Sequence, residues 1–182
     1  MGKTYSEIDE TMRDFVERQH VFFVATAPNS VDGHVNCSPK GLDSLRILGQ
    51  TTVAYLDYTG SGAETIAHVR ENGRIVIMLC AFEGAPKIVR FHGKGEAIQP
   101  GDPEWNALLA HFTPGIGVRS IIRIEVDRIS DSCGFGVPHL QFEGERTQLP
   151  AWAVKKGENL PSYRREKNAT SIDGLPALRF GE

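Results

Sequence analysis

Six short runs of strand-forming residues, with few helical patterns between them, constrain the fold of this chain more than any other feature of its sequence. Each run is rich in apolar and β-branched residues, and turn-forming Gly, Pro, Asn and Asp residues separate the runs. The runs cover residues 21–26, 34–38, 51–56, 74–82, 87–98 and 120–129. A doubly wound parallel sheet needs a helix after nearly every strand, and only one such helix is indicated here. The pattern therefore predicts a mainly β fold with a few helices, arranged as a closed antiparallel barrel.

Helical patterns are expected at three places. Ser6 and Asp9 open an amphipathic segment, a second helix ends at Asn72-Gly73, and Asp102 with Pro103 has the composition of an N-cap followed by a first helical residue. The apolar residues of the first segment are Ile8, Met12, Phe15 and Val16, and those of the last are Trp105, Leu108, Leu109 and Phe112. Their helical spacing predicts that they face the core.

The sequence changes character near Glu143. Prolines and charged clusters alternate there with apolar residues that are too scattered to form a second core, namely Trp152, Leu160, Tyr163, Leu175 and Leu178. We therefore predict one domain over residues 1–142 and an extended C-terminal tail over residues 143–182, which packs on the barrel or on a partner subunit.

The segment 52–65 carries the strongest indication of a ligand. An apolar strand is broken by Gly60 and Gly62, and Ser61 followed by Glu64 has the spacing of a capping box at the start of a helix. A strand that leads through such a turn into a helix leaves several backbone N–H groups directed at one place, which favours an anion and above all phosphate. The alternative is an ordinary capped helix whose free N–H groups meet water.

Two other segments supply cations that suit the same site. Residues 35–41 end a strand with polar side chains and with Lys40, whose ammonium is a compact charge that binds phosphate well. Residues 87–90 add Lys87 and Arg90. The alternative for Lys40 is a solvated lysine in a turn.

The overall composition excludes several classes of partner. A net charge of −3 and a pI of about 6.1 give no basic field for nucleic acid or for an anionic membrane, and no apolar run is long enough to span a bilayer. Cys37, Cys80 and Cys133 lie far apart and predict neither a disulfide framework nor a metal site. We expect a cytoplasmic protein with no metal, no nucleic acid and no membrane partner.

Three blocks of sequence, taken together, resemble the pyridoxamine 5′-phosphate oxidase-like, FMN-binding split-barrel family. The blocks are residues 36–41, 55–66 and 90–95, and their order and spacing match over roughly residues 10 to 130. The resemblance is strongest to the oxidase-related branch of the family. It implies a six-stranded antiparallel split β-barrel with flanking helices, and a homodimer that holds two FMN molecules at the subunit interface.

The resemblance also implies which residues bind the flavin. Residues 35–40 match the strand that lies along the flavin, and Tyr55 and Leu56 match a pair at the end of the next strand. Ser61 and Gly62 fall where the oxidase has an Arg-Lys phosphate clamp, so phosphate is expected to be held by Lys40, Ser61 and helix N–H groups. The full set of expected cofactor-binding residues is Val35, Asn36, Cys37, Ser38, Lys40, Tyr55, Leu56, Ser61, Gly62, Glu64, Thr65 and Lys87.

The function implied by the resemblance is that of an FMN-dependent oxidoreductase with an unknown substrate and no identified catalytic residue. Oxidation of pyridoxamine phosphate is not expected, because residues 173–180 lack the Arg-x-His-Asp-Arg-like segment of the oxidase. One alternative is a non-catalytic module that binds flavin, heme or deazaflavin on the same barrel, with His68 or His92 as a heme ligand. Another is a dimeric barrel that binds no ligand.

Overall fold

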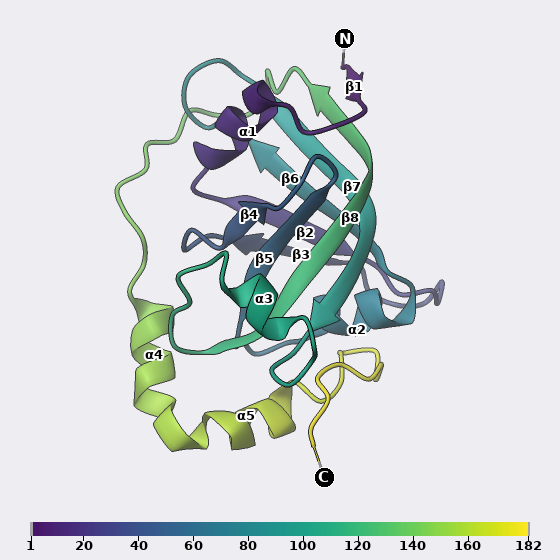
Figure 1. Ribbon diagram of the computed structural model, residues 1–182, viewed down its shortest axis with the longest axis vertical. Coiled ribbons are helices and arrows are strands. Elements are labelled where there is room, and N and C mark those ends of the chain that lie inside the picture. Colours follow the sequence, from purple (N-terminus) through teal and green to yellow (C-terminus); the bar gives the residue numbers. More distant parts are fainter. Residues whose placement is uncertain (1, 182) are drawn as a thin grey trace.

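One strongly curled antiparallel sheet forms the body of the protein in this computed structural model, which describes residues 2–181 (Figure 1). Its strands follow the order β3-β2-β6-β7-β8-β5-β4, and β1 pairs with β8. The strands are β1 (Thr4–Tyr5), β2 (Phe22–Thr26), β3 (Asn36–Lys40), β4 (Leu45–Ile47), β5 (Thr52–Tyr58), β6 (Arg74–Cys80), β7 (Ile88–Ile98) and β8 (Val118–Ser132). The prediction of a mainly β split barrel is confirmed. The six predicted runs form β2, β3, β5, β6, β7 and β8, and the short strands β1 and β4 add to them.

Short helices surround this sheet. They are α1 (Glu10–Glu17), α2 (Glu64–Glu71), α3 (Trp105–Leu109), α4 (Gln148–Lys156), the 3₁₀ turn η1 (Gly157–Asn159) and α5 (Leu160–Lys167). Within residues 2–181, none of them combines the length and the apolar character that crossing a bilayer requires.

The helix starts differ in detail from those predicted. The carboxylate of Asp9 accepts a hydrogen bond of 2.8 Å from the N–H of Met12, so Asp9 rather than Ser6 is the N-cap of α1. The carboxylate of Asp102 does not cap α3, because it accepts from the N–H of Gln99 at 2.8 Å. That helix consequently begins at Trp105, after Pro103, and not at the proline. The predicted left-handed stop of α2 is confirmed at Gly73, whose φ is 74°.

The core is filled from the inner face of the curled sheet. Val24, Tyr55, Ile77, Phe91 and Ile124 come from different strands and are completely buried. Burial of one such side chain stabilises a fold by roughly 1.5–3 kcal/mol relative to leaving it exposed. The predicted apolar face of α1 covers one end of this core through Met12, Phe15 and Val16.

The sheet does not close through backbone pairing, which corrects the prediction of a closed barrel. β3 is one edge of the sheet and β4 is the other, and a turn over residues 41–44 joins them. Leu42 and Asp43 in this turn both have a left-handed backbone, with φ of 60° and 48°. Within residues 2–181, β3 and β5 have no backbone pairing, and a side-chain contact links them across the gap, where Lys40 Nζ lies 3.0 Å from Asp57 Oδ1.

The C-terminal region contains helices where extended chain was predicted. Figure 1 shows α4 and α5 as an outer layer, reached by a long connection from β8. Pro150 and Pro161 lie in the first turns of these helices, where proline lacks only an N–H that has no helical partner. The chain then returns to the sheet, and Ala177 and Leu178 are buried in the main core.

Candidate functional site

A cavity of about 670 Å³ occupies the gap between β3 and the end of β5. Its walls are β3, the loop 58–62 with the start of α2, the start of β8 and the C-terminal segment 167–172. Among the predicted cofactor-binding residues, those that line it are Val35, Asn36, Cys37, Ser38, Lys40, Ser61, Gly62, Glu64 and Thr65. A cavity of this size suits a cofactor-sized ligand.

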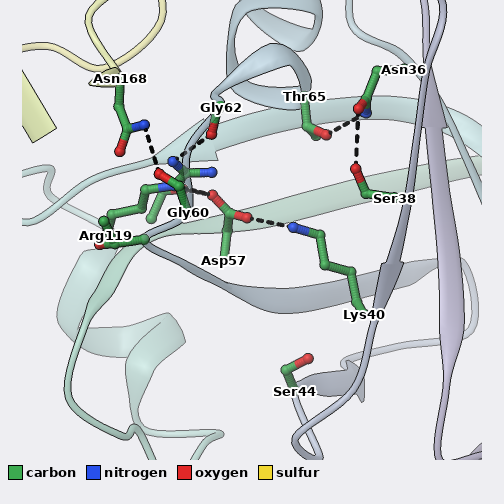
Figure 2. Close-up of polar contacts among 12 residues, drawn as sticks. Asn36, Ser38, Lys40, Ser44, Asp57, Gly60, Gly62, Thr65, Arg119 and Asn168 are labelled. Carbon is green, nitrogen blue, oxygen red and sulfur yellow. Dashed lines mark hydrogen bonds and ion pairs between the residues drawn. The ribbon is translucent and has the colours of Figure 1, made fainter. Parts of the chain in front are cut away.

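Polar side chains of β3 form an ordered row along one wall. Ser38 Oγ donates to Asn36 Oδ1 at 3.1 Å, and Asn36 Nδ2 donates to Thr65 Oγ1 at 3.0 Å (Figure 2). The second contact fastens β3 to the first turn of α2. The amide of Asn36 therefore has a fixed orientation, and its oxygen lies on the side of Ser38.

The row continues into the core and ends at a buried histidine. Asn36 Nδ2 also lies 3.4 Å from Thr26 Oγ1, and the Thr26 hydroxyl lies 2.9 Å from Nδ1 of His68. Burial lowers the pKa of His68, which favours the neutral imidazole, and its Nε2 has no partner among residues 2–181. Neither His68 nor His92 lines the cavity, so the geometry gives no support to either as a heme ligand.

A buried carboxylate organises the inner end of the cavity. Asp57 is fully buried, and it accepts from Lys40 Nζ at 3.0 Å and from Arg119 Nε at 2.7 Å (Figure 2). It also accepts from Ser120 Oγ at 3.3 Å. Burial by itself raises the pKa of Asp57, but the charges of Arg119 and Lys40 outweigh it and hold the pKa of that carboxyl well below its usual range. The cluster of two cations and one carboxylate therefore carries a net positive charge.

Arg119 is the main residue of the site that the sequence reasoning missed. It stands one position before the predicted run 120–129 and enters the site from β8, which pairs with β5 in a register that places Ser120 opposite Asp57. Its side chain is almost fully buried, and its Nη1 donates to the carbonyl oxygen of Gly62 at 2.7 Å. Pairing the strand of Asp57 with the run 120–129 would have found it, because Arg119 directly precedes Ser120, the residue opposite Asp57.

The predicted capping box at Ser61 and Glu64 is wrong. Helix α2 begins at Glu64, with Ala63 at the N-cap and no side-chain capping bond, so Glu64 is the first helical residue and not the third. Its carboxylate turns back over Gly62, where an added Cβ would clash with it. Glu64 therefore places a negative charge beside the helix start.

The backbone that favours an anion is nevertheless present. The carbonyl oxygens of Gly60 and Gly62 accept from Asn168 Nδ2 at 3.0 Å and from Arg119 Nη1 at 2.7 Å (Figure 2). Within the described chain, the N–H groups of residues 61–63 have no hydrogen-bond acceptor. Free N–H groups at a helix start, next to an arginine, form an environment that stabilises phosphate.

Three predicted residues do not line this cavity. Tyr55 and Leu56 lie in the middle of β5, which is covered on both faces, and both are buried. Lys87 lies elsewhere on the molecule, with its Nζ 3.9 Å from Asp131 Oδ2 and 5.1 Å from the centre of the Phe15 ring. Within a single chain, Lys87 is therefore not part of the cavity beside β3.

Residues of the C-terminal segment complete the cavity, and the sequence did not predict them. Lys167, Thr170, Ser171 and Ile172 line it opposite β3. Asp173 fixes this segment to the loop before β3, because its carboxylate accepts from the backbone N–H of His34 at 2.8 Å and lies 2.7 Å from His34 Nδ1.

Comparisons with known proteins agree with this architecture. The family model described as pyridoxamine 5′-phosphate oxidase matches residues 8–133. The pyridoxamine 5′-phosphate oxidase family protein ustO of Aspergillus flavus is 37% identical over 193 residues, which cover 96% of this chain and 77% of that protein. The match to ustO thus includes the C-terminal region, which the family model leaves out.

Solved structures share the fold over about two thirds of the chain. The H111A variant of HupZ from Group A Streptococcus is 25% identical, with a TM-score of 0.55 over 69% of this chain and 99% of that one. A presumed pyridoxamine 5′-phosphate oxidase of Lactobacillus delbrueckii is 14% identical, with a TM-score of 0.52 over 70% of this chain and 98% of that one. The second of these shows the fold alone.

Proposed function

This chain belongs to the pyridoxamine 5′-phosphate oxidase family, and from this premise we propose that it binds FMN in the cavity beside β3 and acts as a flavin-dependent oxidoreductase. The single observation that carries the proposal is the set of free N–H groups of residues 61–63 beside Arg119. A monophosphate is the part of FMN that such a group of donors would hold.

Arg119 supplies the positive charge that the loop itself lacks. Its Nε and Nη1 are engaged by Asp57 and Gly62, and its Nη2 has no acceptor among residues 2–181. Lys40 likewise has one ammonium hydrogen directed at Asp57 and two others free for a ligand. Hydrogen bonds from charged donors are roughly twice as strong as neutral ones, so these cations compensate for the missing Arg-Lys clamp at Ser61 and Gly62.

The remaining cavity suits a flat ring system. Asn36 and Ser38 offer polar atoms along β3, while Val35 and Ile172 are exposed apolar residues at the cavity wall. Val35 is 74% exposed and Ile172 is 70% exposed, so covering them removes apolar surface from water. In this arrangement β3 positions the ring and the C-terminal segment excludes water from it. A bound flavin supplies the electron-transfer chemistry, which requires no dedicated acid–base pair from the protein.

We propose that the substrate is not pyridoxamine 5′-phosphate. Residues 173–180 lack the oxidase motif, and part of this segment is turned into the core at Ala177 and Leu178. Arg179, the only arginine of the segment, pairs with Asp102 away from the cavity.

The proposed assembly is a homodimer in the cytoplasm with flavin at the interface. Exposed apolar side chains that a partner subunit could cover support this proposal, namely Val35, Phe135, Leu140 and Phe142. Cys37, Cys80 and Cys133 are all free thiols, which suits a reducing compartment.

Absorbance of the freshly purified protein tests the proposal. A flavin spectrum is expected, and mass spectrometry of the material released on denaturation should identify FMN. Changing Ser61 to Glu should expel FMN through repulsion of its phosphate while the protein remains folded. If saturating FMN gives neither a thermal shift nor quenching of flavin fluorescence, the proposal fails. Anaerobic reduction of the bound flavin by NADH or NADPH separates an oxidoreductase from a module that holds flavin without turnover.

A further inference from the structure

The C-terminal segment after α5 is held firmly beside the loop 58–62. Asn168 is fully buried at the end of α5, and its backbone N–H donates to Arg164 at 2.8 Å while its carbonyl accepts from Leu178 at 3.0 Å. Ala177 and Leu178 are buried in the main core. These contacts fix the backbone position of Asn168 when the C-terminal segment is packed on the sheet.

The Asn168 side chain reaches the loop that carries the free N–H groups. Its Nδ2 donates to the carbonyl oxygen of Gly60 at 3.0 Å, while Arg119 holds the carbonyl oxygen of Gly62 from another direction (Figure 2). In a trans peptide the C=O and N–H groups point in opposite directions. Fixing the Gly60 carbonyl therefore also fixes the direction of the Ser61 N–H.

The loop needs such an anchor because of its composition. Glycine has access to more backbone conformations than any other residue, and nothing lies within 4 Å of a Cβ added at Gly60. No neighbouring group therefore packs against Gly60 from the direction that a side chain would take. The hydrogen bond from Asn168 is a specific restraint on the Gly60–Ser61 peptide.

The other half of the Asn168 amide adds no stability to the fold. Its Oδ1 is buried and has no partner among residues 2–181. An unpaired buried acceptor is unfavourable, and an apolar side chain of the same shape would avoid it. The contribution of the amide thus lies in its contact with Gly60.

We propose that Asn168 is a positioning residue for the phosphate group of the ligand, which acts through Gly60 and makes the phosphate site depend on docking of the C-terminal segment. This inference rests on the proposed FMN function. It adds that a residue outside the family match at 8–133 determines the preference for a phosphorylated flavin over an unphosphorylated one.

The test compares dissociation constants for FMN and for riboflavin, which has no phosphate. The wild-type protein should prefer FMN. Asn168→Ala and the size-matched Asn168→Leu should lose about three- to tenfold of that preference, the range expected for one hydrogen bond, with riboflavin binding unchanged. Arg179→Ala is the matched control, because it removes a hydrogen-bonding side chain of the same segment that contacts Asp102 and not the loop. It should leave the preference intact.

Two results overturn the inference while the proposed function stands. One is an unchanged preference for FMN in the Asn168 variants, and the other is an equal weakening of FMN and riboflavin, which a merely structural role produces. If the wild-type protein does not prefer FMN to riboflavin, both proposals fail. The dissociation constants of the wild-type protein alone show this result.

Hydrogen exchange on the wild-type protein gives a readout that no folding defect can obscure. FMN should slow amide exchange in residues 61–63, which riboflavin should leave unchanged, and it should slow exchange in residues 168–178 more than riboflavin does. Protection of residues 61–63 alone would overturn the coupling to the C-terminal segment.

Discussion

The carboxylate of Asp57 and the guanidinium of Arg119 meet at 2.7 Å, Oδ2 to Nε, and both side chains are almost completely buried. Asp57 lies near the end of β5 and Arg119 near the start of β8, so the pair joins two neighbouring strands. The same guanidinium holds the Gly62 carbonyl at 2.7 Å. One buried ion pair therefore serves both the sheet and the loop of the candidate site.

Removing one partner of this pair should destabilise the protein strongly. Arg119→Met leaves the Asp57 carboxylate buried with Lys40 as its remaining cation, and a broken buried pair costs about 3–5 kcal/mol. Urea unfolding measures the change in the free energy of unfolding. The double variant Asp57→Asn with Arg119→Met should recover much of the loss, because no buried carboxylate is left without its arginine and the ammonium of Lys40 is partly exposed to water. Strict additivity of the two single changes would show that the pair is not coupled.

The stability of the protein should fall in acid because of Asp57. Its folded-state pKa lies below the ordinary value of 3.8, so the folded protein keeps the carboxylate ionised at a pH where the unfolded chain protonates it. The stabilisation is full above about pH 5 and is lost as the pH falls through the ordinary value and below it. The difference in unfolding free energy between wild type and Asp57→Asn, measured from about pH 7 to pH 3, isolates this carboxyl. A difference independent of pH would contradict the assignment.

Lys40 should contribute to binding through the phosphate group. Lys40→Met removes a charged donor, and loss of a hydrogen bond to a charged group should weaken FMN binding about 10- to 100-fold with little effect on riboflavin. Isothermal titration with the two flavins measures this directly. Lys94→Met is the control, because Lys94 is exposed on β7 and its ammonium donates to Asn72. Equal losses for FMN and riboflavin would argue against phosphate as the partner of Lys40.

Glu64→Gln should strengthen FMN binding and slightly weaken the fold. The carboxylate lies over Gly62, close to where the proposal places a phosphate, and a charge contact near the surface of about 0.2–1 kcal/mol corresponds to a gain of about 1.4- to 5-fold. The same change removes an acidic residue from the first turn of α2, at a cost of about 0.3–1 kcal/mol. Binding at low and high salt, together with thermal unfolding, separates the two effects. Weaker FMN binding in this variant would mean that Glu64 assists the ligand.

Much of the fold follows from patterns local in the sequence. Alternation and apolar runs predicted the six longer strands, because five of them bury one or both faces and β3 alternates half-buried with exposed residues. β1 and β4 are too short, at 2 and 3 residues, to show a period. Helices α4 and α5 were missed because both have a proline in the first turn, and because α5 has polar residues on most sides.

The candidate site was predictable only where its residues are neighbours in the sequence. β3 and the loop before α2 each form a continuous block, and both line the cavity. Arg119 and residues 167–172 reach it through contacts between distant positions, such as the 62 residues that separate Asp57 from Arg119 and the 108 that separate Gly60 from Asn168. The capping box failed because the spacing of Ser61 and Glu64 does not determine where α2 begins.

The absence of backbone pairing between β3 and β5 has a consequence for the whole molecule. A ligand that touches β3 on one side and the loop after β5 on the other substitutes for the missing strand contact. Entry of that ligand breaks no hydrogen bond between strands. On the proposed binding mode, the cofactor would therefore link the two edges of the curled sheet, which the backbone leaves unpaired.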